Sequence, residues 1–276
     1  MKNECVEENP LQRFHDSMSH LFAISATYDD LPSDLIREIY ALIDNYYLES
    51  LSILRSSVKT EKRILSEIES KLEESRKRLQ KLAELKKEMD ESNLEYANYT
   101  QATHVANREF QFRQIELEGE MSSLAALVML LSLLESTLFR LTRTLIEANS
   151  SLPKMHDVMN RSDNGIVKYL KYFEKYIETQ EQSFIVGTKK YELLKFWLKV
   201  RNNIVHSNNV ASEEILKDSK KLRIDISIDG FTKKFRFKHD DVMALGGLCG
   251  EILDDCIEKG LYYYFKVEEV IAENNV

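Results

Sequence analysis

Three polar side chains at the end of an apolar stretch have the types and spacing for chemistry: Arg201, Asn202 and His206. Histidine exchanges protons near neutral pH, which suits general acid–base catalysis. Arginine stays charged and offers a planar fork to phosphate oxygens, and asparagine can orient the histidine or the phosphate. Because RNA carries its own nucleophile, the 2′-hydroxyl, these groups predict a cleavage that needs no metal or other cofactor and leaves a 2′,3′-cyclic phosphate.

The geometry of a helix limits how these residues can act together. Five residues advance about 140° beyond one full turn, so Arg201 and His206 do not share a helix face. Asn202 and His206, four residues apart, do share one. A joint site for Arg201 and His206 therefore requires the helix to end nearby, or a second copy of the chain to supply the complement.

An Arg-Asn pair followed by a histidine four residues after the asparagine resembles the signature of the HEPN superfamily, over roughly residues 120–270. That superfamily consists of compact helical domains, many of which are metal-independent ribonucleases of toxin and antiviral defence systems. The resemblance implies an endoribonuclease whose motifs meet across a homodimer interface. Toxins of this family that are silenced by adenylylation carry a tyrosine two residues past the histidine, and Asn208 stands there in this chain. We therefore do not expect that form of control.

Glu135 is a further candidate because it interrupts an apolar helix, and a buried carboxylate costs several kcal/mol unless it is paired. The resemblance favours a role in orienting the Arg201/His206 pair. The alternatives are exposure to solvent or a structural ion pair with Arg140 or Arg143.

The region around the motif is basic although the chain is acidic overall. Between Val186 and His239 there are 13 Lys/Arg and 6 Asp/Glu, a net of +7, so the remainder carries −8 − 7 = −15. A basic surface attracts phosphates, and Lys195, Lys199 and Asn203 are the candidate RNA-binding residues. The alternative is an ordinary solvated face.

The elements that must position these residues are expected to be mostly helical, because 276 residues include only 8 Gly and 3 Pro, with neither between Ser33 and Glu118. Heptads in this region predict a coiled coil. Their two columns are Leu51, Val58, Leu65, Leu72, Leu79 and Leu54, Ile68, Leu82, Met89, Tyr96. The seam fits a hairpin within one chain, a dimerisation rod, or an arm that binds a regulatory protein. A break is expected at 90–93 or 98–100.

The predicted fold is mainly α: a helical bundle of HEPN type with a long coiled-coil-like helical hairpin and one small β-hairpin. We divide the chain into an N-terminal helix (1–32), the arm (33–119) and the HEPN-like domain (120–276). Alternating apolar residues around Asp229-Gly230 predict the β-hairpin at about 222–238.

Three cysteines, Cys5, Cys249 and Cys256, show neither a disulfide framework nor zinc spacing. No apolar leader opens the chain, and the most apolar run, Leu124–Leu134, is shorter than the roughly 20 residues of a membrane span. A cytoplasmic protein without a membrane role is expected. Two other functions fit the same residues: a non-catalytic coiled-coil scaffold, and a helical domain that binds nucleic acid without cleaving it.

Overall fold

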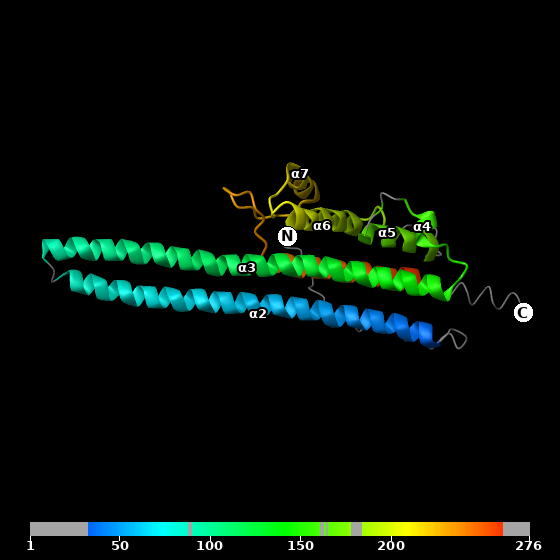
Figure 1. The fold of residues 1–276 in the computed structure, drawn as a ribbon, viewed down its shortest axis with the longest axis horizontal. Coiled ribbons are helices and arrows are strands. Elements are labelled where there is room, and N and C mark those ends of the chain that lie inside the picture. Colours follow the sequence, from blue (N-terminus) through cyan, green and yellow to red (C-terminus); the bar gives the residue numbers. More distant parts are fainter. Residues whose placement is uncertain (1–32, 88–89, 161–162, 164, 178–183, 262–276) are drawn as a thin grey trace, which may run out of the picture.

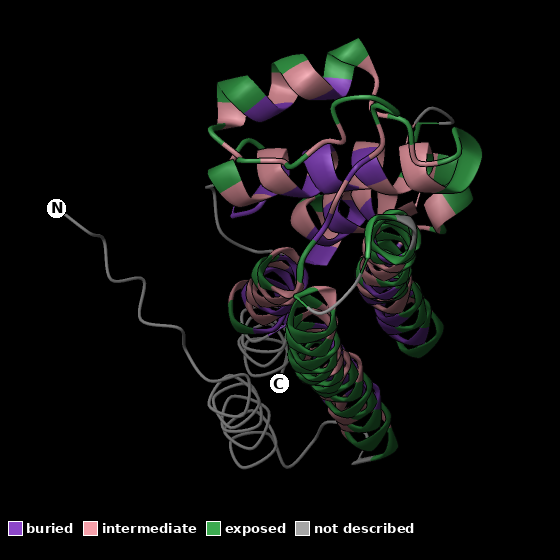
Figure 2. Ribbon diagram, turned by 90° about the vertical axis from the view of Figure 1, so that its left-hand side faces the viewer, coloured by how far each residue is buried: buried purple, intermediate pink, exposed green. Residues whose placement is uncertain are grey.

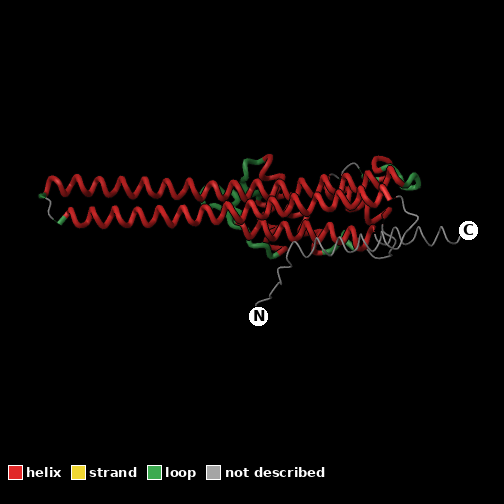
Figure 3. The backbone as a smooth tube through the Cα atoms, turned by 90° about the horizontal axis from the view of Figure 1, so that it is seen from below, coloured by secondary structure: helices red, strands yellow, loops and turns green. Residues whose placement is uncertain are grey.

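The computed structural model describes residues 33–87, 90–160, 163, 165–177 and 184–261. Over these residues it is a mainly α-helical protein, as predicted, and it has two isolated β-bridges but no strand. The N-terminal helix predicted at 1–32 lies outside the described residues. A long pair of helices extends beyond a cluster of shorter ones (Figures 1 and 3).

The long pair is an antiparallel hairpin formed within one chain. Helix α2 (Ser33–Lys86) and helix α3 (Glu91–Ala148) lie side by side along their length (Figures 1 and 3). The chain turns between them at the first of the two predicted breaks, where the Asp90 side chain caps α3 by accepting a hydrogen bond from the Asn93 amide at 2.9 Å. The second candidate, 98–100, is helical.

The outer part of this hairpin is thin, and we call residues 65–122 the arm tip. Among its described residues only Ser75, Ala97 and Ile115 are buried. Much of the long hairpin is coloured as exposed in Figure 2. The large apolar residues exposed on the arm tip are Leu65, Leu85, Leu94, Tyr96, Tyr99, Phe110, Leu117 and Met121. Two helices alone cannot cover both sides of an apolar seam, so this part contributes little to the core.

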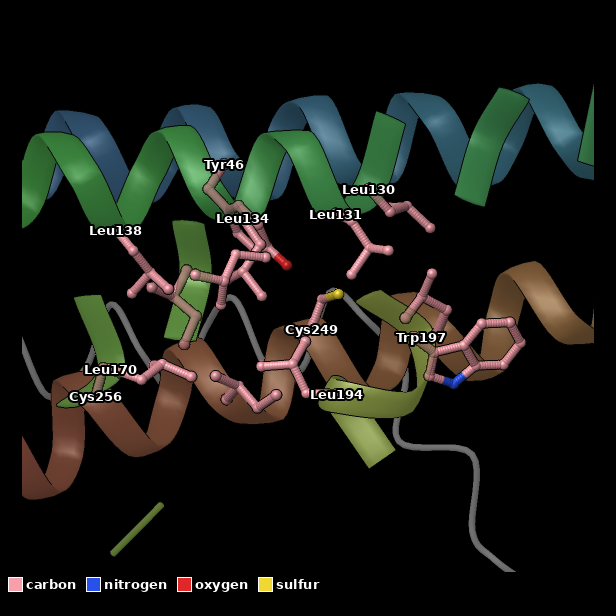
Figure 4. Close-up of a cluster of buried hydrophobic side chains, with 14 of the residues drawn as sticks. Tyr46, Leu130, Leu131, Leu134, Leu138, Leu170, Leu194, Trp197, Cys249 and Cys256 are labelled. Atoms are coloured by element: carbon pink, nitrogen blue, oxygen red, sulfur yellow. The ribbon is translucent and has the colours of Figure 1, made fainter. Parts of the chain in front are cut away.

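The core is built around the inner half of α3. Leu130, Leu134 and Leu138 are completely buried there (Figure 4). The first turns of α2 pack along α3, and α8 (His239–Asp255) lies against both helices. Helices α5 (Gly165–Tyr172) and α6 (Lys189–His206) contact α3, and the short helices α4 (Met155–Val158) and α7 (Glu213–Leu222) complete the domain.

Helix α3 is also long and apolar enough to cross a membrane by length and composition. Its most apolar 18-residue window has a mean hydropathy of 1.8, and half of that window is buried inside the structure. Helix α3 contributes buried leucines to the hydrophobic core and contacts α5, α6 and α8, as expected for the core helix of a bundle.

Two helices change to the wider π geometry at their ends. Helix α5 continues as η1 (Phe173–Ile177), helix α8 continues as η2 (Cys256–Leu261), and the two π segments lie against each other. Cys249 and Cys256 are buried in this region, and burial raises the pKa of the Cys249 thiol to about 12. A thiol that stays protonated in an apolar environment is chemically inert.

The β-hairpin predicted at 222–238 is not confirmed. The described residues form only the bridges Ile228 to Phe235 and Val210 to Lys234. The turn itself is present, because the Asp229 amide donates to the Lys234 carbonyl at 2.8 Å. Leu222, the first residue of the predicted hairpin, is instead the last residue of α7. Arg223 follows it in a left-handed conformation that ends the helix.

Because the arm tip buries so little, we expect the core to survive a shorter arm. Deleting 69–82 from α2 together with 101–114 from α3 removes two heptads from each helix and keeps the seam in register. The melting temperature of the core should change by less than about 3 °C, measured by circular dichroism. A control that deletes 69–82 alone leaves 101–114 of α3 without a partner helix and should lower helicity. Loss of folding in the paired deletion would show that the arm tip is part of the folding unit.

Candidate functional site

The candidate residues lie at the C-terminal end of α6. The helix begins after Thr188, whose hydroxyl accepts a hydrogen bond from the Tyr191 amide at 3.3 Å. Its buried face is directed into the core and consists of Tyr191, Leu194, Phe196, Trp197 and Val200. The helix ends at His206, and Asn208 and Asn209 follow with φ of 51° and 64°, which turns the chain away. The motif therefore stands at a true helix end.

Arg201 reaches sideways from α6 to α3. Its Nη1 lies 3.4 Å from Glu135 Oε2, and its Nη2 donates to Ser132 Oγ at 3.3 Å. The two charged side chains are about one-third exposed, at 29% and 31%. Glu135 thus pairs with Arg201. Arg143, one of the alternative partners, pairs with Glu147 instead.

The first residue of α5, Gly165, lies beside the Glu135 carboxylate. Gly165 opens α5 with φ of +56°, and a Cβ at this position would lie 3.0 Å from Glu135 Oε1. A helix N-terminus favours a nearby negative charge. Burial, together with the charge of Glu135, raises the pKa of Tyr169 one helix turn further along α5. Sequence analysis did not single out Gly165 or Tyr169.

Asn202 and His206 lie on a different face of α6 from Arg201. Both are exposed, and the spacing of Lys195, Lys199, Asn202 and His206 (i, i+4, i+7, i+11) places all four along one outer stripe. The His206 side chain makes no hydrogen bond or ion pair with the described part of the chain. Within one chain, therefore, no contact joins Arg201 to His206, which agrees with the helical geometry expected from their spacing.

Two of the candidate RNA-binding residues, Lys195 and Lys199, form ion pairs within the chain. Lys195 pairs with Glu192 at 3.0 Å, and the Asn203 side-chain oxygen is buried without a hydrogen-bond partner in the described structure. Lys199 contacts two acids of α7, Glu214 at 2.5 Å and Asp218 at 2.7 Å. Hydrogen bonds to these acids raise the pKa of Lys199. Its positive charge is therefore largely neutralised locally.

A second basic surface, which sequence reasoning did not single out, lies on α7 and the residue that follows it. Four exposed side chains there have no ion pair among the described residues: Lys217, Lys220, Lys221 and Arg223. Helix α7 packs against α6, so this surface is close to the motif helix. The Lys-rich run 217–223 in the basic segment was the signal that could have found it.

Over the described ranges, no group of three or more His, Cys, Asp or Glu side chains is arranged to hold a metal ion. Comparison of the chain with protein-family models, with curated proteins and with solved structures found no match.

The Arg201–Glu135 pair can be tested by a double-mutant cycle. We expect Arg201→Ala and Glu135→Ala to be coupled by about 0.5–1.5 kcal/mol in the free energy of unfolding, because both side chains are partly shielded from water. Urea denaturation of the two single variants and the double variant measures this coupling. The exposed pair Arg143–Glu147, at 65% and 61% exposure, is the matched control and should couple more weakly. Strictly additive effects for Arg201 and Glu135 would mean that the pair does not form.

Proposed function

We propose that this protein is a metal-independent endoribonuclease effector of the toxin or antiviral defence type, with a HEPN-like helical domain. One observation carries the proposal: at a single helix end, Arg201 is held by Glu135 on α3 while Asn202 and His206 remain exposed. Phosphodiester cleavage requires a cation at a defined position and an acid–base group that the substrate can reach. Glu135 acts as a positioning residue for Arg201.

The reaction needs a proton acceptor and a proton donor on opposite sides of the phosphorus. One His206 removes the proton from the 2′-hydroxyl, whose oxygen attacks the phosphorus. The bond from phosphorus to the 5′-oxygen breaks, and a protonated second His206 gives its proton to that oxygen. Arg201 stabilises the charge on the non-bridging oxygens. The products are a 2′,3′-cyclic phosphate and a 5′-hydroxyl.

This scheme requires two copies of the chain, and we propose a homodimer around the end of α6. Arg201 and His206 are on different faces of one helix, so a second chain completes the site. Val205, between them, is an apolar residue with 55% exposure. Apolar residues of this kind are suited to burial in an interface.

The arm is proposed to bind a regulatory protein in the cytoplasm. Its support is the set of exposed apolar side chains along the arm tip. Exposed apolar patches often mark interaction sites. The paired-deletion variant tests this role, because it should retain RNA cleavage yet lose its response to such a partner.

The alternative function is a non-catalytic coiled-coil scaffold, and one observation favours it. The Arg201–Glu135 pair is explained by stability alone, and an exposed histidine in the last turn of a helix is a common arrangement without chemistry.

Cleavage of RNA distinguishes the two functions. We expect the purified protein to cleave total RNA or tRNA in EDTA and to leave 2′,3′-cyclic phosphate ends, identified by mass spectrometry. His206→Ala and Arg201→Ala should each reduce the rate by about 10²-fold or more. The control variants His156→Ala and Arg143→Ala remove exposed residues of the same types and should cleave normally. Activity that persists in His206→Ala would exclude this site, and inactivity of a folded dimer towards all RNAs would favour the scaffold.

The homodimer makes a separate prediction. Val205→Asp places a charge in the proposed interface, so light scattering should show a shift from dimer to monomer and cleavage should fall with it. Leu85→Asp, a matched change at the exposed arm tip, should leave the dimer intact. An unchanged dimer in Val205→Asp would place the interface elsewhere.

A further inference from the structure

A cavity of about 400 Å³ opens where the base of the arm meets the segment 227–239. In Figure 1 this segment is the orange loop that reaches the middle of α3. The volume suits a small molecule. Apolar side chains from both sides form part of the wall, among them Ile64 and Ile68 of α2 and Phe237 of the segment.

The charged groups of the wall favour a cation. Three carboxylates, Glu61, Glu116 and Glu120, face two basic residues, Arg236 and Lys238. Arg236 is already engaged, because it lies 3.6 Å from Glu120 and also pairs with Asp229. Glu61 and Glu116 have no ion-pair partner among the described residues. Lys238 has no ion-pair partner among the described residues either, so three carboxylates and two basic groups leave the wall with a net charge of −3 + 2 = −1.

Two of these carboxylates also repel each other. Glu116 and Glu120 are four residues apart on α3, where like charges repel. Burial raises the pKa of Glu120, and the nearby charges of Glu116 and Asp229 act in the same direction, while Arg236 lowers it. A positive group placed between the carboxylates would relieve this repulsion.

An unpaired hydroxyl in the wall offers a ligand a polar contact that does not depend on the charges. Ser123 is only 7% exposed and lines the cavity, yet its hydroxyl makes no hydrogen bond within the described structure. Ser57, a neighbouring wall residue, differs because its Oγ lies 3.1 Å from His239 Nδ1. The Ser123 hydroxyl is open to the cavity, where a ligand atom can replace water as its hydrogen-bond partner.

An anion is disfavoured at the same place. The N-terminus of α8 reaches the cavity at His239, and helix N-termini attract anions. Here that end is occupied, because the Asp241 side chain accepts a hydrogen bond from the Lys238 amide at 2.8 Å. An added anion would also meet the carboxylates of Glu61, Glu116 and Glu120 in the cavity wall.

We propose that this cavity binds a small organic cation, with its ammonium group among Glu61, Glu116 and Glu120 and its apolar body against Ile64 and Phe237. The Ser123 hydroxyl provides the remaining polar contact. This inference does not depend on ribonuclease activity, because binding is measured without RNA.

The cavity is also connected to the end of α6. The Phe235 amide donates to the Asn209 carbonyl at 3.1 Å, and the Ala211 amide donates to the Lys233 carbonyl at 2.9 Å. The loop that follows His206 is therefore hydrogen-bonded to the segment that forms one wall of the cavity. If the proposed cleavage occurs, a bound cation is positioned to change it through this loop.

Calorimetric titration of the full chain tests the proposal. The probes are phenethylammonium, agmatine and spermidine, and phenylacetate serves as an anion with a similar apolar body. We expect at least one cation to bind with a stoichiometry of one per chain, and phenylacetate not to bind. Glu116→Gln should weaken that binding by about tenfold or more, because it removes a charge-assisted contact. Ser123→Ala should weaken it several-fold.

The matched control is Glu118→Gln, since Glu118 is on the same helix but pairs with Arg63 and does not line the cavity. It should bind the cation as the unmodified protein does. Binding that is equally weakened in Glu118→Gln would indicate a nonspecific charge effect and would overturn the proposal. So would the absence of binding by all three cations, or binding of phenylacetate in their place.

Discussion

The rest of the structure depends on burying the inner half of α3. This half is apolar nearly all round, and Leu130, Leu134, Leu138 and Leu141 are completely buried. A helix of this kind is stable in water only when other elements surround it. Helices α2, α5, α6 and α8 each bring an apolar face to it. The motif helix is therefore held by the same contacts that hold the fold.

The candidate site follows from one polar interruption in that apolar helix. Glu135 would be costly within the core without a cation, and Arg201 supplies one from α6. Gly165 leaves room for the carboxylate beside α5. The pairing fixes where Arg201 points, which leaves His206 on the outer face, 140° or so around the helix. A packing requirement in the core thus sets the arrangement of the exposed residues.

Much of this arrangement could be predicted from sequence, because it depends on short-range periodicity. The heptads, the break before Glu91 and the end of α6 at His206 are local signals. Other features depend on which elements meet in space. The ion pairs of Lys199 with α7 join residues 15 and 19 positions apart, and periodicity does not specify them. The predicted β-hairpin was not confirmed for a similar reason. Alternation predicts one apolar face, and Ile224, Ile226 and Ile228 do pack against the core. A strand also requires a continuous backbone partner, which alternation does not specify.

The seam of the long hairpin closes within a single chain, so each molecule keeps an arm of its own. A symmetric pair of molecules would present two such arms, each helix extending about 1.5 Å per residue away from the core. A target with a single binding site would engage one arm, whereas a repetitive target, such as a filament or a ring of identical subunits, would engage both. The second contact would then form at a high effective concentration. The arm would in this way distinguish assembled targets from dispersed ones through geometry, with no change in the contacts of either tip.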